Sequence, residues 1–293
     1  MRNRALLGAA LAASLIAGPA AAQGHVSTST AWLAQHLHDP NLVLLHVGDE
    51  AQYKAAHVPG ARFVQLRDVS TSQGGLSLEM LSAAELRQRL QALGIGDRSH
   101  VVIYYGDDWV SPATRILFTL NAAGLGSRTE LLDGGMRKWR KEGGAVTADA
   151  TPPVKPGTLA AFTLHAPIVD AAFVQAHAGK PGYALIDARA PIYYNGQQQS
   201  GAHGHMQRGH IPGAHNLPYD SVTNDDLTMK TPAQLRAMFH DAGVKPGDKV
   251  IAYCHIGQQG TAVVAAARIA GIDAVLYDGS FEDWTTRNLP VAQ

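Results

Sequence analysis

The chain has 293 residues, with 24 basic and 24 acidic side chains, so its formal charge is zero. A neutral chain argues against nucleic acid as a partner, because binding to a phosphate backbone needs clustered Lys and Arg. The length is roughly twice that of a typical domain and predicts two domains.

Residues 1–22 have the pattern of a secretory signal peptide. Arg2 and Arg4 form a basic start, an apolar run follows over residues 5–18, and small residues end the segment. We therefore expect cleavage after Ala22, export to the periplasm and no membrane contact afterwards. The alternative is an N-terminal membrane anchor, but the run is short for a bilayer-spanning helix. Cleavage would leave 22 basic and 24 acidic side chains, a formal charge of −2.

The rest of the chain is predicted to contain one domain twice. Three segments recur in the same order: AAHVPGARFVQL (55–66) as RGHIPGAHNLPY (208–219), HVVIYYGDDW (100–109) as DKVIAYCHIG (248–257), and LLDGGMRKW (131–139) as LYDGSFEDW (276–284). We expect domains at 23–146 and 159–293, joined by a proline-rich linker at 147–158. This alignment places Gly106 opposite Cys254. The matching tryptophans, Trp139 and Trp284, are expected to serve packing.

Strands and helices are predicted to alternate in each copy. In the second copy the pattern indicates strands at 183–188, 249–254 and 274–279, with helices at 231–243 and 260–271. This order predicts an α/β fold: a parallel sheet flanked by helices on both faces. Ligands bind such sheets at the carboxyl ends of strands, where Cys254 lies.

Cys254 is the only cysteine of the chain, so it cannot form an internal disulfide. It is either an inert core residue or a reactive thiol. The segment CHIGQQG leads from the strand into a helix, whose N-terminus can direct backbone N–H groups at an anion. Gly257 and Gly260 permit tight curvature.

A thiolate in such a loop can carry out two kinds of reaction. A cysteine phosphatase needs an arginine six positions after the cysteine to clamp the phosphate dianion, and Gly260 occupies that position. A persulfide carries one negative charge, which backbone N–H groups can stabilise unaided. The loop therefore favours sulfur transfer.

Four features together resemble the tandem-domain rhodaneses, which are thiosulfate or 3-mercaptopyruvate sulfurtransferases: GHIPGA (209–214), DAR (187–189), the loop after Cys254, and YDGSFEDW (277–284). The resemblance spans nearly all of the chain after the leader. It implies an inactive first domain, a catalytic second domain that carries a Cys254 persulfide, and no cofactor. The implied partners are a small sulfur donor and a thiophilic acceptor. The alternative is a persulfide carrier that delivers sulfur to a protein partner.

The resemblance also implies which residues form the site. The expected substrate-binding residues are Arg189, His255, Ile256, Gly257, Gln258, Gln259, Gly260 and Thr261, supported by Asp187 and His210. Arg189 could instead form a structural salt bridge, and His255 could be a solvent-facing loop residue. The loop lacks the basic residues of thiosulfate-specific relatives and the Gly/Ser sequence of mercaptopyruvate-specific ones. No second arginine follows Arg189 closely, so thiosulfate is the favoured donor, with 3-mercaptopyruvate as the alternative.

The segment SGAHGHMQRGH, residues 200–210, brings three histidines together. Clustered histidines can bind zinc or copper, but no cysteine or acid accompanies these three and their spacing matches no compact metal motif. We expect no metal here. The segment is an insertion relative to the first copy and is expected to lie over the mouth of the active site.

Overall fold

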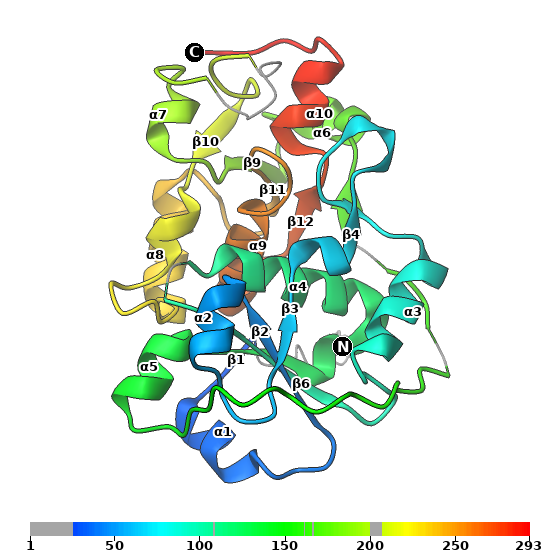
Figure 1. Cartoon of the computed structure of the whole chain (residues 1–293). Coiled ribbons are helices and arrows are strands. Elements are labelled where there is room, and N and C mark those ends of the chain that lie inside the picture. The colour runs from blue at the N-terminus through cyan, green and yellow to red at the C-terminus, as the bar shows by residue number, and fades with distance from the viewer. Residues whose placement is uncertain (1–25, 108, 161, 166, 200–206) are drawn as a thin grey trace, which may run out of the picture.

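The computed structural model describes residues 26–107, 109–160, 162–165, 167–199 and 207–293. These residues form two α/β domains in tandem, each built on a five-stranded sheet (Figure 1). The predicted leader and most of the His-rich segment lie outside the described residues. Within the described part of the chain, no helix is long and apolar enough to cross a membrane.

The first domain contains a parallel sheet in the order β1-β7-β6-β2-β3. Its strands are β1 (Ser27–Thr28), β2 (Leu42–Val47), β3 (Arg62–Val64), β6 (His100–Tyr105) and β7 (Thr129–Leu132). Its helices are α1 (Thr30–His36), α2 (Glu50–Ala55), α3 (Ala83–Ala92), α4 (Ser111–Leu120) and α5 (Gly135–Lys141). A short antiparallel pair, β4 (Ser70–Thr71) and β5 (Glu79–Met80), forms a separate small sheet.

The second domain repeats this architecture. Its strands are β8 (Ile168–Val169), β9 (Tyr183–Asp187), β10 (Ala214–Asn216), β11 (Lys249–Tyr253) and β12 (Ala274–Tyr277). Its helices are α6 (Ala171–His177), α7 (Pro191–Tyr194), α8 (Pro232–Asp241), α9 (Gly260–Ala270) and α10 (Ser280–Thr286). The sheet is parallel, in the order β8-β12-β11-β9-β10, which matches the first domain strand for strand. The predicted fold class is confirmed.

Helices cover both faces of each sheet because the central strands are apolar on both sides. On the outer faces, Trp139 of α5 packs in one cluster with Tyr104, and Trp284 of α10 packs in another with Tyr253. Each indole donates to a backbone carbonyl six residues further along, at 2.8 Å. The inner faces share one apolar cluster that includes α4 of the first domain and α9 of the second. These two helices pack against each other (Figure 1).

Two tyrosines fix the structural correspondence between the domains. The N–H of Val58 donates to Tyr104 Oη (3.0 Å), and the N–H of Ile211 donates to Tyr253 Oη (3.1 Å). Val58 and Ile211 occupy the same place in the two recurring PGA turns. Tyr104 and Tyr253 are therefore equivalent residues of β6 and β11.

This correspondence corrects the sequence alignment by one residue. Tyr105 and Cys254 each follow the equivalent tyrosine, and both belong to the inner apolar cluster. Tyr105, and not Gly106, is thus the counterpart of Cys254. The alignment matched the Val-Ile pairs of the two strands, but side chains alternate between faces, so a shift of one residue puts every side chain on the wrong side.

Candidate active site

Cys254 directly follows β11 and is fully buried. Its N–H donates to Ser280 Oγ (3.1 Å), and its carbonyl accepts from the N–H of Phe281 (3.0 Å). Ser280 has a φ of 53°, which is rare for a residue other than glycine, and its hydroxyl also donates to the Tyr277 carbonyl (2.8 Å). The start of α10 thus holds the backbone of the cysteine in place.

The loop after Cys254 has its carbonyl groups tied to specific donors. His255 O accepts from Glu282 N (3.0 Å), Gly257 O from Arg115 Nη1 (3.1 Å), Gln258 O from Thr261 Oγ1 (2.6 Å), and Gln259 O from Ala262 N (3.0 Å). A trans peptide points its N–H away from its C=O. Among the described residues, none accepts a hydrogen bond from the N–H groups of residues 255–260. These groups are available to an anion.

Two glycines allow the loop to pack closely on its surroundings. Gly257 has a φ of 78°, and a Cβ there would lie 2.5 Å from the Asp278 carbonyl oxygen. Gly260 is the first residue of α9, and a Cβ there would lie 2.9 Å from Leu276 Cδ1. Larger residues would push the loop and the N-terminus of α9 away from β11 and β12.

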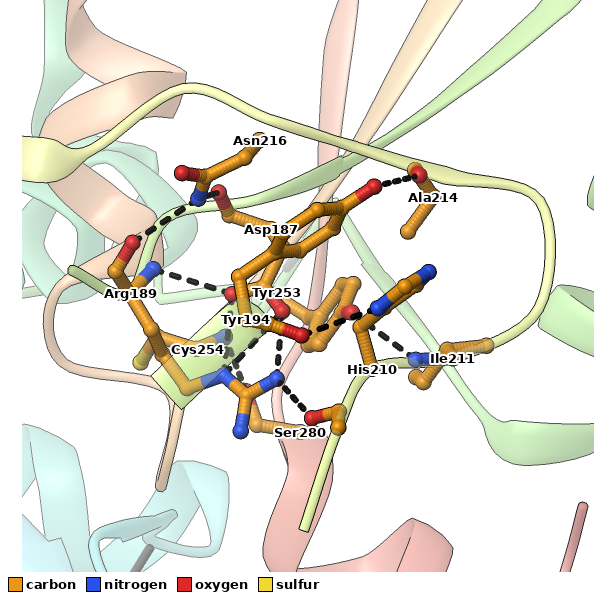
Figure 2. Close-up of polar contacts among 11 residues, drawn as sticks. Asp187, Arg189, Tyr194, His210, Ile211, Ala214, Asn216, Tyr253, Cys254 and Ser280 are labelled. Carbon is orange, nitrogen blue, oxygen red and sulfur yellow. Dashed lines mark hydrogen bonds and ion pairs between the residues drawn. The ribbon is translucent and has the colours of Figure 1, made fainter. Parts of the chain in front are cut away.

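Arg189 and Asp187 form a fully buried ion pair beside Cys254 (Figure 2). Arg189 Nε lies 2.9 Å from Asp187 Oδ1, and Nη2 lies 2.5 Å from Oδ2. Nη2 also donates to the Gly209 carbonyl (2.8 Å), and the guanidinium stacks 4.0 Å from the centre of the Phe281 ring. Burial by itself would lower the pKa of Arg189, but the charge of Asp187, with a further contribution from Cys254, raises it.

This geometry defines what Arg189 can contribute. Its positive charge lies near the sulfur, but Asp187 balances that charge and fixes the guanidinium. A donor anion that contacts Arg189 would have to reach a side chain with 0% exposure. The direct contact expected from the sequence stays a prediction.

His255 is half-buried and lies edge-on to Tyr193, with ring centres 4.7 Å apart. Burial, reinforced by the charge of Arg189, lowers its pKa to about 4. Its Nδ1 is buried and has no partner in the described part of the chain. At neutral pH the ring is therefore uncharged, and it offers a hydrogen bond to a ligand but no positive charge.

His210 shapes the turn of the GHIPGA segment. Its Nδ1 lies 2.9 Å from the Tyr194 carbonyl, and its ring stacks on Tyr194 with centres 3.9 Å apart (Figure 2). In the first domain, His57 and Tyr53 make the same pair of contacts, at 2.8 Å and 4.1 Å. Because the contact recurs in a domain without a cysteine, it belongs to the fold.

The first domain supplies contacts to the loop that the sequence analysis missed. Gln258 Nε2 donates to Ser111 Oγ (3.1 Å), Thr114 and Thr261 hydroxyls lie 2.9 Å apart, and Arg115 reaches the Gly257 carbonyl. Ser111, Thr114 and Arg115 share one face of α4 and are buried. The available signal was the spacing of these polar residues, three and four apart, in a helix whose other residues apart from Thr119 are apolar.

The equivalent position of the first domain has different chemistry. In the strand pairings, His46 lies opposite Tyr104 as Asp187 lies opposite Tyr253, so His46 replaces Asp187. Two residues later, Gly48 stands where the second domain has Arg189. With Tyr105 in place of the cysteine, this domain lacks the thiol and both members of the ion pair.

Comparison with known proteins identifies the family. Residues 29–142 and 170–287 each match the rhodanese-like domain. A putative thiosulfate sulfurtransferase of Mycobacterium tuberculosis, SseB, is 34% identical over 241 residues, covering 80% of this chain and 82% of the relative. The thiosulfate sulfurtransferase of Rattus norvegicus is 30% identical over 277 residues, covering 89% and 92%.

Two further relatives add detail. The sulfur carrier protein TtuD of Thermus thermophilus is 29% identical over 282 residues, covering 90% of this chain and 94% of the relative. The crystal structure of SseA from Escherichia coli, described as a 3-mercaptopyruvate sulfotransferase, superposes with a TM-score of 0.76 at 24% identity. It covers 87% of this chain and 98% of SseA, and at that identity it bears on the fold alone. The chain belongs to the rhodanese family of sulfurtransferases, as a protein of two tandem rhodanese-like domains.

Proposed function

We propose that this protein transfers sulfane sulfur from thiosulfate to a thiophilic acceptor through a persulfide on Cys254. The observation that carries the proposal is the placement of Cys254. It stands at the base of a loop whose N–H groups, at residues 255–260, have no acceptor in the described structure, directly before the N-terminus of α9. Relatives named thiosulfate sulfurtransferase that cover most of the chain support the same reaction.

The reaction takes place in two displacements. The Cys254 thiolate attacks the outer sulfur of thiosulfate, the S–S bond of the donor breaks, and sulfite leaves with the bonding electron pair. The acceptor, for example cyanide, then attacks the outer sulfur of the persulfide, and the thiolate leaves. The negative charge that passes through both steps is stabilised by the loop N–H groups and by α9. The neutral Gln258 and Gln259 add no opposing charge.

The charges around the loop favour thiosulfate as the donor. Mercaptopyruvate carries a carboxylate, which is best recognised by a dedicated arginine fork. Arg189 is committed to Asp187, and Arg115 to Gly257 and Asp278. Thiosulfate has no carbon skeleton and needs only the loop donors.

Steady-state kinetics with both donors at two ionic strengths test this choice. We expect a higher kcat/KM for thiosulfate and a KM for it that rises with salt, because the binding is electrostatic. A clear preference for mercaptopyruvate would contradict the assignment and direct attention to a more distant basic residue such as Arg208.

A persulfide carrier is the second candidate, supported by the similarity to the sulfur carrier TtuD. Its protein acceptor would have to reach a sulfur with 0% exposure, whereas a small donor and acceptor need a much smaller opening. Turnover of thiosulfate with cyanide supports the enzyme. A persulfide that persists with cyanide but is discharged by a protein thiol would support the carrier.

We further propose that residues 23–146 form a noncatalytic domain, 147–158 a linker and 159–293 the catalytic domain. The first domain has Tyr105, His46 and Gly48 where the second has Cys254, Asp187 and Arg189, which supports a noncatalytic first domain. The pattern of residues 1–22 supports a signal peptide and a periplasmic protein.

A further inference from the structure

We propose that Arg115, a residue of the first domain, is a positioning residue that sets the orientation of the Gly257–Gln258 peptide in the persulfide loop. The inference rests on the proposed function. It gives the noncatalytic domain a defined part in the reaction, although it supplies no reacting atom.

Arg115 is built into the boundary between the domains. It extends from α4 and is 1% exposed. Its Nη1 donates to the Gly257 carbonyl (3.1 Å) and to Asp278 Oδ1, while Nη2 donates to Asp278 Oδ2 (3.3 Å) and to the Leu78 carbonyl (2.5 Å). Asp278 and Leu78 thus fix the plane of the guanidinium, and Gly257 receives a donor whose position is determined by both domains.

The contact matters because it decides which way one peptide unit faces. The Gly257 carbonyl and the Gln258 N–H belong to the same peptide, so holding the carbonyl against Arg115 turns the N–H to the opposite side. Gly257 has a φ of 78°, and glycine lacks the Cβ that would restrict rotation of this unit. Without Arg115 the buried carbonyl would lose its side-chain donor, and a half-turn of the peptide would replace an N–H donor of the loop by a carbonyl dipole that repels an anion.

The two domains do not share this device. The helices α4 and α9 correspond at their starts, because Ser111 and Gly260 each lie six residues after the equivalent residues Tyr105 and Cys254. In this register Arg115 corresponds to Val264, a buried apolar residue of α9. The first domain therefore holds the loop of the second with an arginine, and the second domain has no arginine at the corresponding place in α9.

The test uses intact mass to measure the rate at which thiosulfate loads sulfur onto Cys254. Removing Arg115 alone would leave Asp278 as an unpaired buried charge. The variant is therefore the double substitution Arg115→Met with Asp278→Asn. We expect loading to slow by about 100-fold, the usual effect of losing one backbone donor to a developing anion. The persulfide, once formed, should also decay faster in acceptor-free buffer at a temperature where both proteins remain folded, a change that a modest loss of fold stability does not cause.

Arg137→Met is the matched control. Arg137 also crosses the domain boundary to a carbonyl, that of Asp225, at 3.0 Å, but it does not contact the loop. Its variant should load sulfur at the wild-type rate. A folded Arg115→Met/Asp278→Asn protein that loads within about threefold of wild type and keeps its persulfide lifetime would overturn the proposal.

Arg115→Lys provides a second, independent variant. The ammonium can pair with Asp278 but cannot reproduce the planar fork that reaches Asp278, Leu78 and Gly257 together. We expect it to fold, and to load sulfur faster than the double variant yet about tenfold more slowly than wild type. If the double variant does not fold, wild-type loading by Arg115→Lys overturns the proposal. If the wild-type protein itself does not load sulfur on Cys254, the proposed function fails, and the positioning role fails with it.

Discussion

Tyr105 in the first domain occupies the position that Cys254 occupies in the second, at the carboxyl ends of the equivalent strands β6 and β11. The side chains serve different purposes. The Tyr105 hydroxyl donates to the Leu227 carbonyl across the domain boundary (2.6 Å). One copy of the fold thus has a cysteine at this point, while the other has a tyrosine that makes a contact between the domains.

The first prediction follows from that equivalence. Introducing a cysteine as Tyr105→Cys in a Cys254→Ser protein should not restore sulfur loading. Asp107 lies two residues after position 105, and its negative charge disfavours a thiolate there. The site also has His46 and Gly48 in place of the buried ion pair of the second domain. Intact mass after thiosulfate treatment, with Cys254→Ser alone as control, checks this. A sulfur adduct on residue 105 would show that the first site is competent.

The second prediction concerns the buried pair of Arg189 and Asp187. Arg189→Met should lower the free energy of unfolding by about 3–5 kcal/mol, because it leaves an uncompensated carboxylate with 0% exposure. Adding Asp187→Asn should recover much of that loss. Urea unfolding of the single and double variants measures both. An Arg189→Met protein of wild-type stability with a raised KM for thiosulfate would instead show that Arg189 mainly binds the donor.

The third prediction is an acid sensitivity that originates in His46. This side chain is 1% exposed, both ring nitrogens lack a partner among the described residues, and burial, with the nearby His57, lowers its pKa to about 4. The unfolded chain takes up this proton below pH 6.5 and the folded chain only near pH 4, so stability should fall as pH drops through that window. At pH 5 the loss is about 2 kcal/mol relative to pH 7.5.

His46→Phe should remove this part of the pH dependence, since the ring lies among the aromatic side chains of Tyr53, Phe63 and Tyr104. Unfolding measured at pH 5 and 7.5 gives the comparison. Substitution of the exposed His240, as His240→Gln, is the control and should leave the wild-type difference in place. An unchanged pH dependence in His46→Phe would mean that other groups cause it.

The fourth prediction concerns export. Expressed in a Gram-negative host, the protein should be recovered from the periplasmic fraction with Gln23 as its N-terminus, because the small residues before it fit signal-peptidase cleavage. N-terminal sequencing of the purified protein decides the point. Recovery of the full-length chain from washed membranes would support an anchor in place of a cleaved leader.

The sequence was sufficient to predict the fold and the neighbourhood of the site. Apolar strands alternating with periodic helices have few arrangements open to them, so the parallel sheet and its helices could be expected from the pattern. The place of Cys254 at the end of a strand followed from the same argument. Local periodicity could not set the register between the copies, because residues 101–105 and 250–253 are apolar on both faces.

Contacts between the domains were beyond the reach of local patterns. Arg115 and Gly257 are 142 residues apart in the sequence and meet only because α4 packs on α9. The pairing of Arg189 with Asp187 is different, since the two residues are neighbours in one short segment and the sequence already allows a structural salt bridge for Arg189. The lowered pKa of His255 depends on burial, which no motif specifies.

The central claim is tested most directly by the intact mass of the protein after treatment with thiosulfate and removal of excess donor. The wild-type protein should gain the mass of one sulfur atom, located on the peptide that contains Cys254, and lose it on addition of cyanide. Cys254→Ser should fold normally, because serine fits the same space, and should gain nothing. Sulfur transfer by Cys254→Ser above the uncatalysed rate, or a wild-type protein that turns over thiosulfate without ever carrying the added sulfur, would contradict the account.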